Sequence, residues 1–343
     1  MPPFPGSVSR FFGAKASFKK HGDLFPFIAY RNAQAVGRIA AIHNRAHNDY
    51  YKDKIGFFGF FDFIDDIEVA RKLFQAACQK MSQLGMTSIR GPFNPSINEE
   101  CGVLIEGYDS SPFIMMPYNP PYYMKIYEAL GLGKARDLHA YYLPLAVEAP
   151  ERMTKVVERV RRQSGIKLRT VDLKHLDKEL PILHRLYNVT LDRNWGFVPI
   201  TLEDLEATAK ELKAIVDPEL VLIAEKNGEA VGYSLALPNV NELMRRVKGS
   251  RSAFMRVLRF LWLLKMKPPK EARWMALGVA PEYRNRGIAP LFYYETLMRG
   301  KRSYIGGEIS WVDETNEEVV QGLAVMGARR YKNYRVYERV LSP

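Results

Sequence analysis

The fold is decided by one stretch of the chain, Leu277-Gly-Val-Ala-Pro-Glu-Tyr-Arg-Asn-Arg-Gly-Ile-Ala-Pro-Leu-Phe292. A strand is expected to end at Val279, and a helix is expected to begin near Gly287 after a turn. The small residues at 287 and 289 let an anion approach the backbone closely. The first N–H groups of a helix have no partner within the helix and lie at the positive end of its dipole. The stretch therefore predicts an anion-binding turn, to which Arg284 and Arg286 add charge suited to a pyrophosphate.

This turn resembles the phosphate-binding turn of the GNAT acetyltransferase superfamily, whose hallmark is Arg/Gln-x-x-Gly-x-Gly/Ala after a strand that ends in an apolar residue. The resemblance implies an acyl-CoA as co-substrate, acetyl-CoA or another, and no metal. Its pyrophosphate would be held by the backbone amides of Arg284, Asn285, Arg286, Gly287, Ile288 and Ala289. The pantetheine arm would pair with the strand end formed by Leu277, Gly278 and Val279. Asn316, at the head of the next helix, would belong to the same cofactor site.

The resemblance extends along most of the chain. The runs 308–316 and 327–338, and the first-half strings 91–102 and 118–123, are similar to a large bacterial group of two-lobed GNAT-like proteins of about this length. This likeness implies fold and cofactor more strongly than it implies a substrate.

Hydrophobic periodicity gives two halves with the same order of elements, which indicates duplication of one mixed α/β unit. Each half is expected to hold a hairpin, a strand, a helix, a strand, a helix and a closing strand. The first-half elements are expected at 25–44, 55–63, 66–84, 87–90, 122–130 and 138–144. The second half is expected at 166–171, 176–194, 202–216, 220–237, 274–279, 287–300, 303–312, 316–326 and 332–340. We therefore expect an α/β mixed-sheet, tandem GNAT acyl-CoA N-acyltransferase fold, with lobes 1–149 and 150–343.

The turn of the first half that corresponds to the anion-binding turn reads Phe63-Ile-Asp-Asp-Ile67. Two carboxylates would repel a pyrophosphate, and no glycine opens the approach. We therefore expect a degenerate N-terminal lobe that shapes the acceptor pocket, and a C-terminal lobe that carries the CoA site.

Acyl transfer to an amine needs a neutral amine and a stabilised oxyanion. Glu308, on the strand after the cofactor helix, is the first candidate to take the amine proton, with Asp313 and Glu314 in reserve. The alternative for Glu308 is a structural ion pair with a neighbouring arginine. A backbone N–H near Val279 would stabilise the oxyanion, and Trp311 would line the pocket or belong to the core.

One position departs from the family pattern. The resemblance would place a tyrosine, the usual acid for the leaving thiolate, seven residues after Asn316, but that residue is Leu323. Tyr334 is the candidate that we carry forward as a catalytic residue, with Tyr283 and Tyr294 as alternatives. The absence of a tyrosine at position 323 would also fit a CoA thiolate that leaves without an acid, or a site that is catalytically inactive.

Composition narrows the function classes. The two cysteines allow no disulfide framework and no Cys-rich metal site. His43 and His47 are expected in a turn without an acidic pair, so no metal centre is predicted. No apolar run reaches the roughly 18 residues of a membrane span, and the first residues lack a secretory pattern. A cytoplasmic protein is therefore expected, and the resemblance implies an enzyme that acts on a small-molecule or peptide amine.

The net charge of +12 is concentrated in residues 241–275, which contain ten basic residues and only two acidic ones, Glu242 and Glu271. The apolar residues Phe254, Val257, Leu258, Leu261 and Leu264 recur there at helical spacing. Such a helix could contact an anionic membrane peripherally, or it could pack as a lid with its basic residues in water, which is the reading that we favour.

Two other functions would also suit the charge: aminoacyl transfer from a charged tRNA, and a non-catalytic CoA- or RNA-binding module. The intact pyrophosphate turn argues against a nucleic acid partner.

Overall fold

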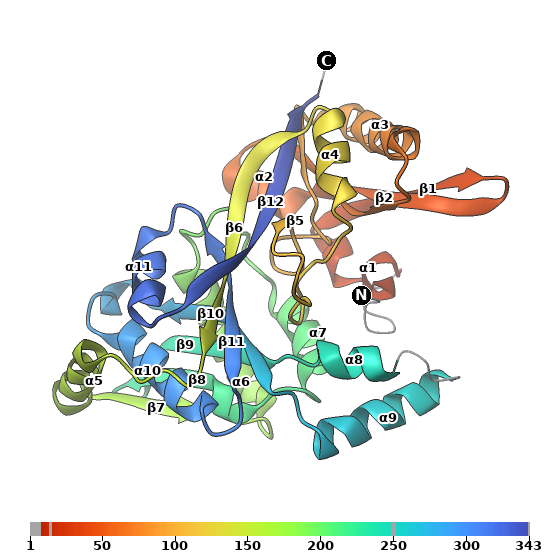
Figure 1. Ribbon diagram of the computed structural model, residues 1–343. Coiled ribbons are helices and arrows are strands. Elements are labelled where there is room, and N and C mark those ends of the chain that lie inside the picture. The colour runs from red at the N-terminus through yellow and green to blue at the C-terminus, as the bar shows by residue number, and fades with distance from the viewer. Residues whose placement is uncertain (1–7, 14–15, 248–251, 342–343) are drawn as a thin grey trace. The chain divides into compact units, whose positions relative to one another are not determined.

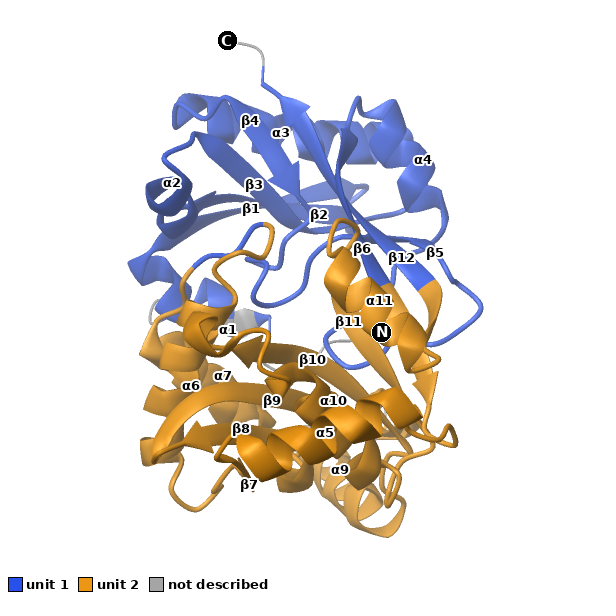
Figure 2. Cartoon of the chain, turned by 90° about the vertical axis from the view of Figure 1, so that its left-hand side faces the viewer, with its two compact units in different colours: residues 1–139, 196–198, 332–343 blue, residues 140–195, 199–331 orange. Residues whose placement is uncertain are grey.

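Figure 1 shows the chain as a computed structural model, which describes residues 8–13, 16–247 and 252–341. Two members of the basic cluster, Lys248 and Arg251, lie outside these residues. The chain divides by its contacts into two units, coloured in Figure 2. Unit 1 comprises Met1–His139, Gly196–Val198 and Lys332–Pro343, and unit 2 comprises Ala140–Trp195 and Pro199–Tyr331.

Unit 1 is built on a mixed sheet with strand order β1-β2-β3-β4-β12, and β5 also pairs with β12. Its strands are β1 (Gly22–Arg31), β2 (Gln34–Asn44), β3 (Ile55–Phe63), β4 (Ser88–Gly91), β5 (Val103–Glu106) and β12 (Arg329–Val340). Its helices are α1 (Ser9–Phe12), α2 (Arg45–Tyr51), α3 (Ile67–Gln83) and α4 (Tyr122–Ala129), with a 3-10 turn at Ser17–Lys20. The apolar face of α3 packs on the sheet, and Leu73, Phe74 and Met81 are fully buried in this core.

Unit 2 carries a second run of paired strands, in the order β6-β11-β10-β9-β8-β7. Its strands are β6 (Gly133–Pro144, from residue 140), β7 (Ile166–Thr170), β8 (Val221–Lys226), β9 (Glu229–Pro238), β10 (Glu271–Val279) and β11 (Gly306–Asp313). Its helices are α5 (Glu151–Gln163), α6 (Leu176–Thr190), α7 (Leu202–Leu212), α8 (Asn241–Val247), α9 (Ala253–Met266), α10 (Ile288–Gly300) and α11 (Glu317–Val325). The core beside α10 contains Trp274, Leu291 and Leu297.

The expected α/β class and mixed sheet are confirmed, because β3–β4 and β10–β11 are parallel while the hairpins are antiparallel. The hairpin turn at Asn227-Gly228 has positive φ angles of 53° and 83°, which this residue pair adopts readily. The helix cap at Thr201 is also present, since its side chain accepts a hydrogen bond from the Asp204 amide.

Four of the helices in the described residues were not predicted: α1, α2, α5 and α8. The expectation that His43 and His47 share a turn is wrong, because His43 lies within β2 whereas His47 is buried on α2. The Asn44 side chain caps that helix by accepting a hydrogen bond from the His47 amide at 3.1 Å. A short cap of this kind is easy to overlook in a sequence, because the helix has only seven residues.

The expected boundary at 149/150 separates two repeats along the sequence, whereas units 1 and 2 group residues that lie close together in space. Strand β12 lies at the end of the sequence and mostly in unit 1, so a contact-based unit need not be one continuous segment. The duplication boundary stays a prediction. Among the helices of the described residues, none is both long and apolar enough to span a membrane.

Candidate functional site

The turn between β10 and α10 has an unusual backbone. After β10 ends at Val279, a short 3-10 helix covers Pro281–Tyr283, and α10 begins at Ile288. Asn285 and Gly287 both adopt the left-handed region, with φ angles of 61° and 80°. Alternating right- and left-handed residues aim successive backbone N–H groups toward the same side, which is how proteins build anion-binding nests.

Five consecutive amides of this turn are available. Within the part of the chain that the structure describes, the backbone N–H groups of Asn285, Arg286, Gly287, Ile288 and Ala289 donate to no protein acceptor. The Arg284 amide, in contrast, already donates to the carbonyl of Pro281 at 3.3 Å. Asn285 and Arg286 are exposed, so an anion can reach this row from solvent. The amides at 285–289 therefore fit a pyrophosphate, and the amide of residue 284 is occupied within the turn.

Gly287 is required at its position. A Cβ atom there would lie 2.5 Å from Cγ2 of Val160, on helix α5. Its φ of 80° also disfavours any side chain. The next residue, Ile288, is buried in a core cluster with Phe292 and anchors the first turn of α10. The turn is thus held between α5 and the core while its amides stay open.

The two arginines of the turn have different roles. The Arg284 guanidinium donates to the carbonyl oxygens of Val279 at 3.3 Å and Thr190 at 3.1 Å, and it lies 3.5 Å from the Asp192 carboxylate. Arg284 therefore fixes the turn to β10 and to the end of α6, in addition to supplying charge. Arg286 is exposed, with its guanidinium 5.4 Å from the ring centre of Tyr283, and can reach a bound anion.

The strands next to the turn separate. In the described residues, parallel pairing between β10 and β11 runs from Glu271–Gly306 to Trp274–Ile309 and ends there. On its other edge, β10 stays paired with β9 as far as Val279, after an irregularity between Trp274 and Ala276. The β11-facing edge of residues 275–279, which includes the predicted contact residues 277–279, is consequently open. An open strand edge offers backbone donors and acceptors to an extended amide chain, which is the chemistry of pantetheine.

Glu308 lies where the two strands part. It is fully buried and pairs in register with Arg273, with its carboxylate 3.8 Å from the guanidinium. Its carboxylate also accepts hydrogen bonds from Ser310 Oγ, at 2.6 Å, and from the Tyr331 hydroxyl. The arginine of this cluster is further held by stacking on Trp311, 4.9 Å from the ring centre. The ion pair that was the alternative to a catalytic role is therefore present.

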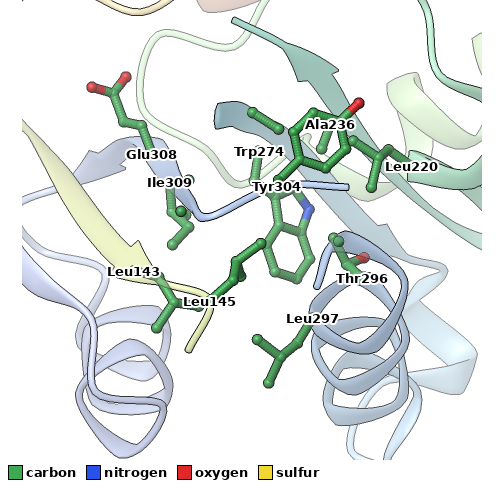
Figure 3. A pocket seen from close by; sticks show the side chains of 14 residues that line it. Leu143, Leu145, Leu220, Ala236, Trp274, Thr296, Leu297, Tyr304, Glu308 and Ile309 are labelled. Carbon is green, nitrogen blue, oxygen red and sulfur yellow. The ribbon is translucent and has the colours of Figure 1, made fainter. Parts of the chain in front are cut away.

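A small, partly open apolar hollow lies on the side of β10 that faces α10 (Figure 3). Its lining includes Leu143, Leu145, Trp274, Leu297, Tyr304 and Ile309, together with Gly306 and Gly307 at the start of β11. Successive strand residues face opposite sides of a sheet, so the side chains of Trp274 and Ile309 face the hollow. Glu308 also borders the hollow, but its side chain is directed to the other side. Figure 3 shows the Glu308 carboxylate pointing away from Trp274.

The remaining predicted residues are found in several places. The Asn316 side chain caps α11 by accepting a hydrogen bond from the Val319 amide at 3.2 Å. Leu323, in the position of the expected tyrosine, is fully buried in the core of unit 2. Tyr334 is fully buried in unit 1, whereas the turn and Glu308 belong to unit 2. Two partners of Glu308 were not identified from the sequence. Tyr331 was not among the candidate tyrosines, and Arg273 was not singled out as the neighbouring arginine.

The corresponding turn of unit 1 is closed. Asp66 caps α3, and its carboxylate accepts a hydrogen bond from the Glu68 amide at 2.9 Å. The same carboxylate is paired with Arg31. A side-chain anion thus occupies this helix N-terminus, as the two aspartates in the sequence suggested.

Comparisons with known proteins agree with this geometry. The model of the acetyltransferase (GNAT) family matches residues 182–321, which include the turn and the open strand edge. "Bacterial ceramide synthase" of Caulobacter vibrioides is 36% identical over 330 residues, covering 94% of this chain and 85% of that protein. "Protein YghO" of Escherichia coli K12 is 34% identical over 319 residues, covering 91% and 81%.

Among solved structures, a tandem GNAT protein from the clavulanic acid biosynthesis pathway shares the fold, with a TM-score of 0.54. It is 12% identical, and the match covers 94% of this chain and 84% of that one. At such identity only the architecture is comparable, and it is a tandem GNAT architecture. With its open amide row, its parted strands and relatives of more than 30% identity along nearly the whole length, the chain belongs to the GNAT acetyltransferase family.

Proposed function

We propose that the protein is an acyl-CoA-dependent N-acyltransferase, in which an amine attacks the thioester directly in a ternary complex. The observation that carries the proposal is the row of five unpartnered amides at 285–289 beside an open strand edge. The amides hold the pyrophosphate, and the edge of β10 pairs with the pantetheine arm. The bound co-substrate supplies an activated acyl group, and the protein's part is to position it and to move one proton.

At the point where β10 and β11 part, the two faces of the sheet differ. On one face lies the apolar hollow, and on the other lies the buried cluster of Glu308, Arg273, Ser310 and Tyr331. A thioester held between the strands would direct its acyl chain to the first face and its carbonyl carbon toward the second. Glu308 then takes the proton of the amine, directly or through water, and a backbone N–H near Val279 donates to the developing oxyanion. As the oxyanion collapses, the C–S bond breaks and CoA leaves as the thiolate.

The acyl group is a fatty chain rather than acetyl in this proposal. A relative with 36% identity is named bacterial ceramide synthase, and a ceramide is a fatty amide of a long-chain amino alcohol. The hollow is lined almost wholly by aliphatic and aromatic side chains, which suits methylene groups. An acetyl group would leave that surface uncovered. The acceptor that matches such a product is the primary amine of a long-chain amino alcohol.

Calorimetry with a series of acyl-CoAs tests the cofactor and the chain length together. Affinity should rise from acetyl-CoA to longer chains, because each buried methylene contributes about 0.8 kcal/mol. Thiol release should then require an added amine. No binding of any acyl-CoA would contradict the proposal, and equal affinity for all chain lengths would contradict the fatty-acyl part alone.

A pair of matched substitutions tests the role of Glu308. Glu308→Gln should lower kcat by about 10²–10⁴ if the carboxylate is the base. Glu338 offers the control: in unit 1 its carboxylate accepts from Ser88 at 2.7 Å and pairs with Arg90 at 2.9 Å, a similar arginine–serine environment. Glu338→Gln should reduce stability and leave kcat unchanged. If both variants lose stability and neither loses kcat, Glu308 is a structural residue.

A further inference from the structure

Helix α9, labelled in Figure 1, carries large apolar side chains that are exposed to solvent. Seven of its large apolar side chains are between 45% and 69% exposed: Phe254, Met255, Val257, Leu258, Leu261, Trp262 and Met266. The helix is already packed on the protein through Phe260 and Leu263, which are buried. The exposed face is therefore additional apolar surface, beyond what the fold of unit 2 uses. Isolated exposed apolar residues are ordinary, but a contiguous group on one helix marks an interaction surface.

The charged residues of α9 itself and of the segment that follows it are all basic. Residues 253–270 contain Arg256, Arg259, Lys265, Lys267 and Lys270 and no acidic residue. Arg259, Lys265 and Lys267 are exposed. Pairing of α9 with α9 of a second copy would bring these cations together and is disfavoured by repulsion. A partner must instead accept apolar side chains and offer negative charge over a broad area.

We propose that α9 lies in the interface of an anionic lipid bilayer. Its apolar residues enter the acyl-chain boundary, and the long basic side chains extend to the headgroups. The helix has 14 residues and is about 21 Å long, so it is too short to cross the roughly 30 Å of hydrocarbon and lies in the membrane plane. The inference goes beyond the proposed function and does not depend on it. If the acceptor is a long-chain amine, the same contact brings unit 2 to the layer where such molecules dissolve.

Flotation of the full-length protein with lipid vesicles tests the inference. Wild-type protein should float with phosphatidylcholine vesicles that contain phosphatidylglycerol, and much less with pure phosphatidylcholine or at high salt. The double variant Leu258→Glu/Trp262→Glu should lower the partition coefficient by about 100-fold or more, since it removes two inserted side chains and adds two repelled charges. Both positions are on the surface, so folding should be retained, as thermal unfolding can verify.

The control is Val325→Glu, which places one of these two added charges at a 57% exposed apolar residue on α11. It should float like the wild type. Trp262 provides a local readout, because its indole is 57% exposed and should shift its emission to the blue on vesicles. Trp262→Phe should retain flotation and lose that part of the shift. Acyl-CoA binding, measured in parallel, should be unchanged in every variant.

Several results would overturn the inference. Flotation that is absent, or that the double variant leaves unchanged, would show that α9 does not enter lipid. A wild-type dimer in light scattering that the double variant abolishes, without vesicle binding, would identify a second copy as the occupant. An acidic protein that binds the wild type and displaces it from vesicles would identify that protein, and not lipid, as the occupant of the α9 face.

Discussion

Replacing Gly287 by alanine tests the central feature of the site, the open amide row. The new methyl group would sit 2.5 Å from Val160 Cγ2, whereas carbon atoms prefer about 3.5–4.0 Å. The turn or α5 must therefore move by about 1 Å. In addition, alanine in the left-handed region costs about 1–2 kcal/mol. The overpacking adds about 1–3 kcal/mol, so the free energy of unfolding should fall by about 2–5 kcal/mol.

The same displacement affects the cofactor. Each hydrogen bond from an amide to a charged phosphate contributes about 1.5–3 kcal/mol. A shift of about 1 Å should remove the equivalent of one such bond, which corresponds to about 10- to 150-fold in the Kd of an acyl-CoA. Calorimetric titration of the folded variant measures this directly. The affinity for acyl-CoA is the informative quantity, because the overpacking and the left-handed backbone lower stability whether or not the turn binds a pyrophosphate.

Gly165→Ala is the matched control, because Gly165 has a φ of 68° and a Cβ added to it would meet no atom within 4 Å. It should lose about 1–2 kcal/mol of stability and keep its affinity for acyl-CoA. The double variant Gly287→Ala/Val160→Ala removes the clashing methyl and should regain part of the affinity, although not the stability. Equal acyl-CoA affinity in Gly287→Ala and Gly165→Ala would refute the assignment of the pyrophosphate to this turn.

Three further predictions concern stability. Burial lowers the pKa of His47, and the nearby Asp53 carboxylate offsets part of this effect. As the pH falls, His47 is therefore protonated in the unfolded chain before it is protonated in the folded protein. The free energy of unfolding should therefore fall as pH drops below about 6.5 toward the folded pKa, and a urea titration series should show a flatter profile for His47→Gln. Leu323→Tyr should destabilise by about 1–3 kcal/mol without raising kcat, because its site is filled, and a more active variant would show that a tyrosine fits there after all. Asp66→Ala should remove the helix cap of α3, seen as a lower urea midpoint, and it should not change the affinity for acyl-CoA.

Local patterns predicted much of the fold. The apolar run Ile55–Phe63 became β3 with the same bounds, and the amphipathic spacing before Leu84 became α3. The turn after Val279 could be predicted because its glycine, its strand end and its helix start are all contiguous in the sequence. Helix α5 was missed, since its only apolar stripe, Met153, Val157 and Val160, lies among charged residues beside an expected boundary.

The features that depend on tertiary contact could not be predicted. Pairing between β10 and β11 ends at Trp274 and Ile309, and nothing in either strand's own sequence marks that point. Tyr331 reaches Glu308 from 23 residues away, so no spacing rule indicates it. An arginine partner for Glu308 was foreseen in kind, but its identity required the parallel register of the two strands. Long-range register is a property of the whole sheet, which a window of sequence does not contain.

The return of the last strand to the first unit has a practical consequence. Tyr337 and Leu341 are part of the core that otherwise consists of residues before 133. A fragment that stops at residue 149 would leave a strand-shaped gap in that core and expose the edges of β4 and β5, so it should aggregate when produced alone. Synthesis must reach β12 before the core of the first unit can close, so a variant that lacks this strand should not form that core.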